Sequence, residues 1–121
     1  MRILNTGLFE YKITGSRVIA CCTHLDNEGS ESREKSVIVI LEKIKQLRKQ
    51  WAVKNEILPV FLPGDFNSFP DQEAYRAMEA SDLMCDLRNY VESKNQYGDT
   101  ITFTGFQPEK DKEEQGRIDF I

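Results

Sequence analysis

The sequence predicts an α/β fold that forms a single domain over residues 1–121. Two observations lead to this prediction. Short apolar runs of strand character alternate along the chain with segments of helical periodicity, and such alternation is typical of α/β proteins. The composition, with 40% hydrophobic and 30% charged residues, is that of one globular domain. A disordered or low-complexity chain is therefore excluded.

The first half of the chain carries the clearest elements. Residues 3–12 and 18–22 are predicted to form two strands around a turn at 14–16, and the almost continuous apolar run 18–22 indicates a strand buried on both faces. Residues 32–51 are predicted to form the longest helix. Its apolar residues recur at helical spacing: Val37, Ile40, Leu41, Ile44, Leu47 and Trp51. Its charged residues, Arg33 and Lys35 among them, are expected on a solvated outer face, with a basic docking face as the alternative.

The second half is predicted to hold shorter elements. They are a second buried strand at 57–62 ended by Pro63 and Gly64, a helix at 71–80 capped by Asp71, a short strand and bend at 101–106, an exposed loop at 107–115 and an alternating strand at 117–121. The chain stops inside this last strand, so we expect it to be a fragment or to need further chain to complete its sheet.

Charge and hydropathy limit the functions and locations to consider. A net charge of −4 does not favour broad electrostatic capture of nucleic acid. No apolar run approaches the roughly 20 residues that a bilayer crossing needs. The first residues carry no secretory signal, and we therefore expect a cytoplasmic protein.

Asp65 and Asn67 follow a predicted buried strand and are the first candidates for chemistry. In extended backbone, positions i and i+2 point the same way, so both side chains would project from the carboxyl end of the strand while Phe66 points into the core. Asp65 could bind a hard cation or accept a proton from water, and Asn67 could donate to a phosphate oxygen. An ordinary turn at the end of a strand is the alternative, because Gly, Asp, Asn and Ser all favour turns.

His24 and Asp119 are the other candidates. His24 is the only histidine and follows the run 18–22, where its ring could donate to phosphate or protonate a leaving group; a partly buried structural histidine is the alternative. Asp119 lies between two apolar residues of the last strand. A carboxylate in such a strand either faces solvent or is paired, and Arg117 on the same face is the ordinary ion-pair partner. The functional alternative is a buried acid that orients a histidine.

Three motifs in order make the chain resemble the endonuclease/exonuclease/phosphatase superfamily. They are Thr-His-Leu-Asp at 23–26, Gly-Asp-Phe-Asn-Ser at 64–68 and Gly-Arg-Ile-Asp-Phe-Ile at 116–121. The stretch Thr-Ile-Thr-Phe-Thr-Gly-Phe at 100–106 and Arg33 also resemble one branch of that group. The resemblance spans residues 17–121, and its second and third motifs are the more specific ones.

The resemblance implies part of a sandwich of two mixed sheets and the hydrolysis of phosphodiester or phosphomonoester bonds with Mg²⁺ or Mn²⁺. By position, His24 looks like the phosphate-contacting histidine, Asp65 like the acid that polarises water or holds the metal, and Asn67 like the amide that steadies phosphoryl oxygens. Asp119 looks like the acid that orients a later histidine, and Arg33 looks like a substrate-binding residue. These roles suit phosphoryl transfer, which depends on positioning and charge stabilisation.

The sequence departs from the family pattern in ways that bear on activity. It lacks the early segment with the metal-binding Glu and the closing Ser-Asp-His segment, and Pro63 precedes Gly64 where relatives have a small residue. An inactive truncated domain that binds a phosphate ligand or a protein is therefore the alternative function. The substrate stays open among small phosphorylated molecules, lipid headgroups and nucleic acid, with residues 27–32 and 107–115 as expected specificity loops.

Overall fold

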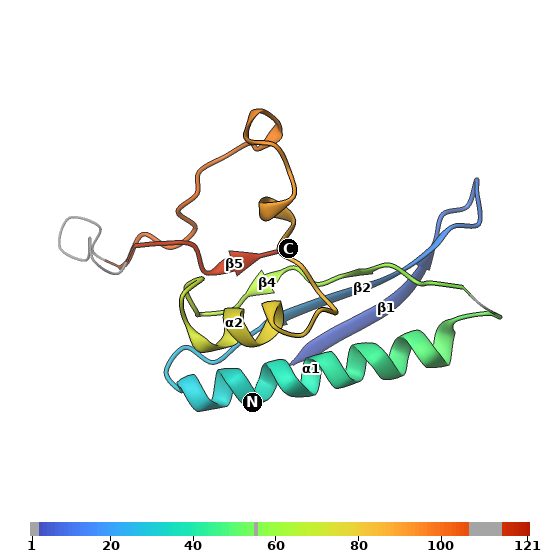
Figure 1. The fold of residues 1–121 in the computed structure, drawn as a ribbon, viewed down its shortest axis with the longest axis horizontal. Helices are drawn as coiled ribbons and strands as arrows, with labels where there is room; N and C mark the ends of the chain where they lie inside the picture. The colour runs from blue at the N-terminus through green and yellow to red at the C-terminus, as the bar shows by residue number, and fades with distance from the viewer. Residues whose placement is uncertain (1–2, 55, 107–114) are drawn as a thin grey trace.

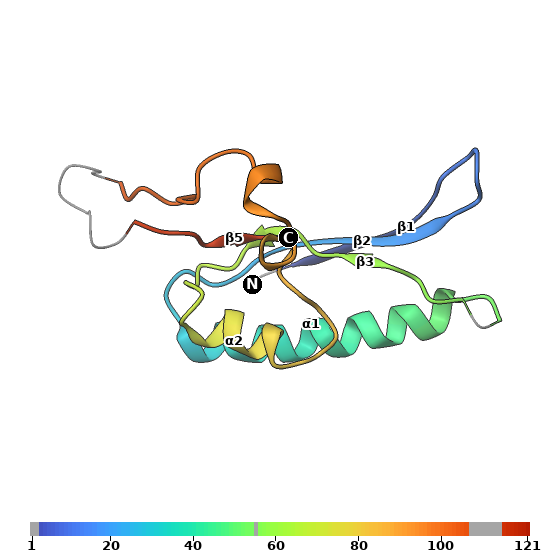
Figure 2. The same cartoon turned by 45° about the horizontal axis from the view of Figure 1, so that its top comes forward.

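The computed structural model describes residues 3–54, 56–106 and 115–121. A mixed sheet forms one layer, and both α-helices lie against the same face of it (Figures 1 and 2). The predicted α/β class is confirmed. In chain order the elements are β1 (Leu4–Glu10), β2 (Arg17–His24), α1 (Ser30–Trp51), β3 (Val60–Phe61), β4 (Gly64–Asp65), α2 (Glu73–Glu79), the 3₁₀ turns Leu87–Asn89 and Ser93–Asn95, and β5 (Asp119–Phe120).

The sheet follows the order β1-β2-β4-β5, and β3 also pairs with β2. β1 and β2 form the predicted antiparallel pair, β2 runs parallel to β3 and β4, and β4 is antiparallel to β5. The register places His24 opposite Asp65 and Asp65 opposite Asp119. Three segments that are far apart in the sequence therefore meet at one place in the sheet.

Burial along β2 alternates, so the prediction of a strand buried on both faces is wrong. Ile19, Cys21 and Thr23 are buried, whereas Cys22 and His24 are exposed. The physical reason is that the helices cover only one face of this sheet (Figure 2), and residues two apart on a strand share a face. The exposed face is the one that carries His24.

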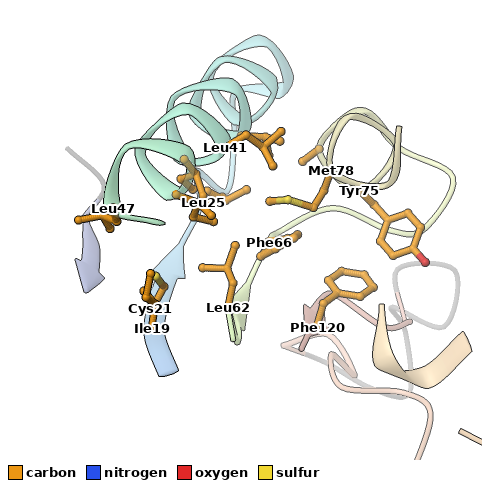
Figure 3. Packing of buried hydrophobic residues seen from close by; sticks show 14 of the residues in the cluster. Ile19, Cys21, Leu25, Leu41, Leu47, Leu62, Phe66, Tyr75, Met78 and Phe120 are labelled. Carbon is orange, nitrogen blue, oxygen red and sulfur yellow. The ribbon is translucent and has the colours of Figure 1, made fainter. Parts of the chain in front are cut away.

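The predicted helix at 32–51 is confirmed as α1, with its apolar stripe in the core (Figure 3). The stripe packs against β2, against α2 and against residues that follow β3. The buried cluster consists of Ile19, Cys21, Leu25, Val37, Ile40, Leu41, Ile44, Leu47, Leu58, Leu62, Phe66, Ala74, Tyr75, Met78 and Phe120. Arg33 was expected on the solvated face, but it is buried because its guanidinium pairs with Glu73 of α2.

The predicted strand at 57–62 is only partly correct. Ile57 is 86% exposed, and only Val60–Phe61 and Gly64–Asp65 pair with β2. Pro59 and Pro63 interrupt the pairing with β2 because proline has no N–H to donate. Their carbonyls still accept hydrogen bonds from the N–H groups of Ile19 and Thr23. Pro63 and Gly64 therefore do not end the strand, which resumes as β4.

The later elements are shorter than predicted. α2 begins at Glu73 with Gln72 as its N-cap residue, so the predicted cap at Asp71 is wrong. The strand expected at 101–103 is reduced to one bridge between Phe103 and Gly116, and the strand at 117–121 is reduced to β5. Most of the loop expected at 107–115 lies outside the described residues. Within the described residues, no helix combines the length and apolar character that a membrane crossing needs.

Candidate functional site

Three of the four residues predicted to be catalytic lie side by side across the sheet. His24 ends β2, Asp65 ends β4 and Asp119 begins β5. Because register partners on neighbouring strands point to the same face, their side chains share the face of the sheet that the helices leave open. The sheet register therefore brings three of the four side chains predicted to be catalytic together.

Asp65 is held between two partners. Its Oδ2 lies 3.4 Å from His24 Nε2, and its Oδ1 accepts a 2.8 Å hydrogen bond from the backbone N–H of Asn67. The His24 side chain is 59% exposed and that of Asp65 is 30% exposed, so both can be reached by a ligand. The site thus presents an imidazole and a carboxylate at a fixed spacing.

Asn67 reaches the site by a turn and not by extended backbone, so the predicted i, i+2 alternation does not apply to it. Its φ of 46° lies in the left-handed region, which Asn tolerates better than most residues. Its Nδ2 donates to the carbonyl of Leu25 at 3.0 Å, which ties the turn to the end of β2. Phe66 is buried as predicted.

Gly64 sets the spacing between β2 and β4. A Cβ atom at this position would lie 2.3 Å from the carbonyl oxygen of Thr23, a distance that no real side chain can occupy. Glycine therefore allows the two strands to approach closely at the residues that precede His24 and Asp65. In this way the glycine of the second motif contributes to the site although it carries no functional group.

Asp119 is exposed, which agrees with the solvent-facing alternative and contradicts both the ion pair with Arg117 and the buried acid. Arg117 does not pair with Asp119 but with Asp86, at 2.6 Å. The Asp119 side chain is not buried, because it stands on the open face of the sheet. The backbone N–H groups of Ile118 and Asp119 both donate to Thr102 Oγ1, at 3.0 and 3.2 Å, which fixes the start of β5.

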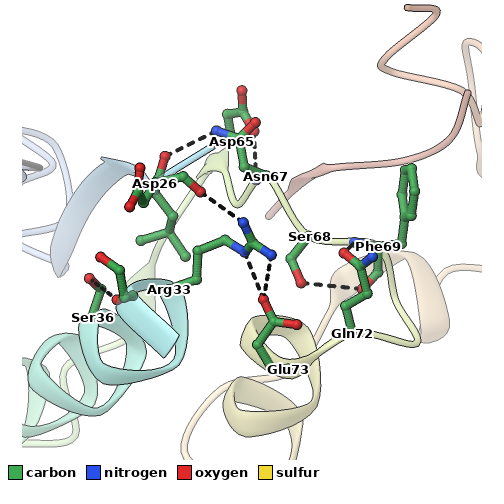
Figure 4. A network of polar contacts seen from close by, with 11 residues as sticks. Asp26, Arg33, Ser36, Asp65, Asn67, Ser68, Phe69, Gln72 and Glu73 are labelled. Atoms are coloured by element: carbon green, nitrogen blue, oxygen red, sulfur yellow. Dashed lines mark hydrogen bonds and ion pairs between the residues drawn. The ribbon is translucent and has the colours of Figure 1, made fainter. Parts of the chain in front are cut away.

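Arg33 is engaged within the protein (Figure 4). Its Nε donates to Glu73 Oε1 at 2.7 Å, and a second guanidinium nitrogen lies 2.6 Å from the same oxygen. A third donates to the carbonyl of Asp26 at 3.2 Å. Arg33 therefore joins the two α-helices to the loop after β2, and its role in substrate binding stays a prediction.

Asp86 is a residue that the sequence did not reveal. Its side chain is 7% exposed and contacts Arg117, the backbone N–H of Arg88 and the hydroxyl of Tyr75. Burial alone would raise the pKa of Asp86, but the donors around it, led by Arg117, outweigh burial and hold the pKa below its ordinary value. The Arg117 guanidinium also stacks on Phe120, 4.6 Å from the ring centroid.

The donor atoms at the site suit a hard cation in part. Asp65 and Asp119 are carboxylates in register on one face, and like charges placed opposite each other repel unless a positive group lies between them. Mg²⁺ is usually bound by one or two carboxylates together with water and substrate oxygens. Among the described residues, however, no group of three or more His, Cys, Asp and Glu side chains is placed to hold a metal.

The chain matches no protein-family model and no curated protein. It is similar to solved structures of endonuclease/exonuclease/phosphatase proteins. One from Bacteroides vulgatus is 28% identical with a TM-score of 0.74, and the match covers 98% of this chain and 42% of that one. A mannosyl-6-phosphatase of Bacteroides thetaiotaomicron is 26% identical with a TM-score of 0.72, over 98% and 41% of the two chains.

The human Nocturnin catalytic domain, solved with a bound sulfate anion, is 17% identical with a TM-score of 0.72, over 98% of this chain and 40% of that one. At that identity the match shows the fold alone. This chain thus spans about two-fifths of the length of the structures it matches. The resemblance to the endonuclease/exonuclease/phosphatase superfamily predicted from the three motifs is confirmed, and the fold is part of the fold of that family.

Proposed function

We propose that this chain carries the phosphate-binding part of a metal-dependent phosphoesterase that cleaves phosphomonoester or phosphodiester bonds by attack of water. The observation that supports the proposal is the row of His24, Asp65 and Asp119 on one face of the sheet, with the backbone N–H of Asn67 hydrogen-bonded to Asp65. Two structures that this chain resembles, a mannosyl-6-phosphatase and an endonuclease/exonuclease/phosphatase protein, agree with this chemistry.

The side chains have distinct roles in this proposal. His24 donates from its exposed ring to a phosphate oxygen, because it stands at the open end of β2. Asp65 orients the attacking water with one carboxylate oxygen, Oδ2. The backbone N–H of Asn67 fixes the other, Oδ1. Asn67 holds the turn in place and so keeps the Asp65 carboxylate aimed at the open face. Asp119 supplies negative charge on the neighbouring strand.

We propose Mg²⁺ or Mn²⁺ as the cofactor, held by Asp65. The oxygen donors of Asp65 and Asp119 are the kind that these ions prefer, and water and phosphate oxygens would complete the shell. When bound, such an ion neutralises charge on the phosphoryl group. Asp65 and Asp119 would then be relieved of their mutual repulsion across β4 and β5.

Asp65→Asn is the variant that tests this function. The amide keeps an oxygen that can accept from the Asn67 N–H but loses the charge, so the turn survives and the chemistry does not. We expect the Mg²⁺-dependent turnover of p-nitrophenyl phosphate or bis-p-nitrophenyl phosphate by the purified chain to fall about 10²- to 10³-fold. The two substrates also distinguish a phosphomonoesterase from a phosphodiesterase.

Asp82→Asn is the matched control, because it makes the same change of side chain and charge at an exposed residue beyond the end of α2. It should leave turnover unchanged. If Asp65→Asn turns over substrate as fast as the unaltered chain, while circular dichroism shows both folded, the role of Asp65 is wrong.

A phosphate-binding module without turnover is the second candidate function. It is favoured by the lack, among the residues the structure describes, of three or more grouped metal-binding side chains. It predicts that inorganic phosphate shifts the amide NMR signals of residues 24 and 65–67 while neither ester is hydrolysed at any Mg²⁺ concentration. Metal-dependent hydrolysis by the purified chain would reject it.

A further inference from the structure

A hollow lies next to Asn67 of the candidate site. It has a volume of about 430 Å³, a size typical of small-molecule sites. We call it the aromatic hollow; three phenylalanines line it together with polar and charged side chains, among them Asn27, Glu28, Arg33, Asn67 and Gln72. The backbone N–H of Asn67 donates to Asp65 and the same residue lines the hollow, so the hollow lies next to the candidate site.

Aromatic rings form one side of the hollow. Phe106 is 93% exposed, and its ring packs edge-to-face on Phe103 with centroids 5.9 Å apart. The Phe106 ring thus leaves nearly all of its surface to water. Single exposed apolar side chains are common, but a hollow lined by aromatic rings together with a few polar groups is typical of ligand sites.

The backbone holds these rings in place. Phe103 and Gly116 exchange two hydrogen bonds of 2.9 Å, which anchors the segment that carries Phe103 and Phe106. The ring of Phe69 packs on Gly116, because a Cβ atom at position 116 would lie only 2.8 Å from Phe69 Cε1. Gly116 therefore allows the Phe69 ring and the Phe103 segment to meet along one wall, so the wall is preformed.

Polar side chains form the rest of the rim. Asn27 and Glu28 come from the loop after β2, and Gln72 comes from the start of α2, where its Oε1 accepts from the Phe69 N–H. Carboxylate and amide groups are good partners for hydroxyl groups.

We propose that the aromatic hollow binds the ring of a phosphorylated monosaccharide whose phosphate lies at His24 and Asp65. A sugar ring has an apolar C–H face that packs on aromatic rings and an edge of hydroxyl groups that pairs with amides and carboxylates. The hollow offers both kinds of surface side by side. This inference rests on the proposed function, because it places the phosphate at the same site.

The test compares two non-hydrolysable ligands in Mg²⁺-containing buffer, methylphosphonate and the phosphonate analogue of glucose 6-phosphate, by NMR titration of the full chain. We expect the sugar phosphonate to bind at least about tenfold more tightly than methylphosphonate. Phe106→Ala should abolish this difference and leave the affinity for methylphosphonate unchanged. Phe106→Tyr, which keeps the ring, should preserve the difference.

Phe9→Ala is the matched control, because Phe9 is an exposed phenylalanine on β1, away from the hollow, and its loss should change neither affinity. Equal binding of the two phosphonates by the unaltered chain would overturn this inference and leave the proposed function standing. If neither phosphonate binds, the proposed function fails as well. If adenosine monophosphate binds more tightly than the sugar phosphonate and loses that advantage in Phe106→Ala, the hollow takes a base and the sugar assignment is wrong.

Discussion

The sheet has two sides, one formed by β1 and β2 with α1 and the other by β4 and β5 with residues 81–106, and they differ in how they are stabilised. On the side of β1, β2 and α1, the elements are long and the core is apolar, with Ile19 and Ile44 fully buried. On the side of β4, β5 and residues 81–106, the strands have two residues each, and polar contacts of Asp86, Arg117 and Thr102 hold them in addition to the buried ring of Phe120. The candidate site lies where the two sides meet, because His24 belongs to the first and Asp119 to the second.

This difference indicates that overall stability and the placement of the site depend on separate residues. Hydrophobic burial is insensitive to direction, so it stabilises the fold without fixing single atoms. Hydrogen bonds and ion pairs are directional, so they can place Asp119 beside Asp65. Variants on the first side should therefore change global unfolding, and variants on the second side should change local opening near the site.

Ile44→Ala is expected to have the largest effect on stability. Ile44 has no exposed surface and lies in the stripe of α1 that contacts the core. Its truncation should lower the free energy of unfolding by about 2–5 kcal/mol, from lost burial and the cavity left behind. Urea denaturation followed by circular dichroism measures this change.

Ile38→Ala is the matched control on the same helix, because Ile38 is 52% exposed. It should change the free energy of unfolding by no more than about 0.5 kcal/mol. Equal losses in the two variants would mean that the apolar stripe of α1 does not carry the stability of this side.

Asp86→Asn is expected to have the next largest effect, and it should act locally. The substitution leaves the Arg117 guanidinium without its carboxylate partner in a site where both side chains are mostly buried. Opening of the β5 side should become easier by about 3 kcal/mol, the lower end of the range for breaking a buried pair. Native-state hydrogen exchange at the amides of Phe66 and Leu87 measures it, because these donate to Ile118 and Ile121.

The effect of this substitution depends on pH in a defined direction. The pKa of Asp86 in the folded state lies below its ordinary value of 3.8, because Arg117 and the other donors favour the charged form over the cost of burial. The stabilisation that the charged Asp86 gives to the folded state is therefore complete above about pH 4. It is lost as the pH falls through the lower pKa that Asp86 has in the folded state. The difference in hydrogen exchange at Phe66 and Leu87 between the unaltered chain and Asp86→Asn should therefore become smaller below pH 4.

Glu31→Gln is the control for Asp86→Asn. Glu31 forms an ion pair of the same 2.6 Å length with Lys35, but both side chains are more than 70% exposed. Its removal should cost less than about 0.5 kcal/mol and leave exchange at Phe66 unchanged. A uniform increase of exchange across both sides of the sheet in Asp86→Asn would contradict the separation of the two sides.

The same contrast explains which parts of the fold could be predicted from the sequence. α1 was predictable because Val37, Ile40 and Ile44 repeat at helical spacing, and that spacing alone determines which face is buried. The run at 18–22 could not show that only one face of β2 is covered, because coverage depends on where the helices pack. β4 and β5 have two residues each, too short for any periodicity to mark their bounds.

The candidate site was predictable in its residues and not in its geometry. His24 and Asp65 were found because polar residues follow apolar strands, and their pairing follows from a strand register that the sequence does not show. Asp86 was missed because its segment has no clear pattern and its partner Arg117 lies 31 residues away. Arg33 was misplaced on the solvated face because only its contact with Glu73 explains its burial.

Thr102→Val is expected to have the smallest effect and is the most specific test of how the site is placed. Valine keeps the shape of threonine but removes the oxygen that accepts from the N–H groups of Ile118 and Asp119. Since Thr102 is exposed, water can replace part of what is lost, and local stability should fall by about 1 kcal/mol. The amides of Ile118 and Asp119 should exchange faster, while urea denaturation of the whole chain changes little.

Thr104→Val, two residues further along the same segment, is the control and should leave both amides unchanged. If β5 positions Asp119 for a ligand, Thr102→Val should also weaken the binding of methylphosphonate a few-fold, although Thr102 carries no role in the chemistry. Faster exchange with unchanged binding would show that the site tolerates movement of β5. The polar contacts of this side would then stabilise the chain without placing the site.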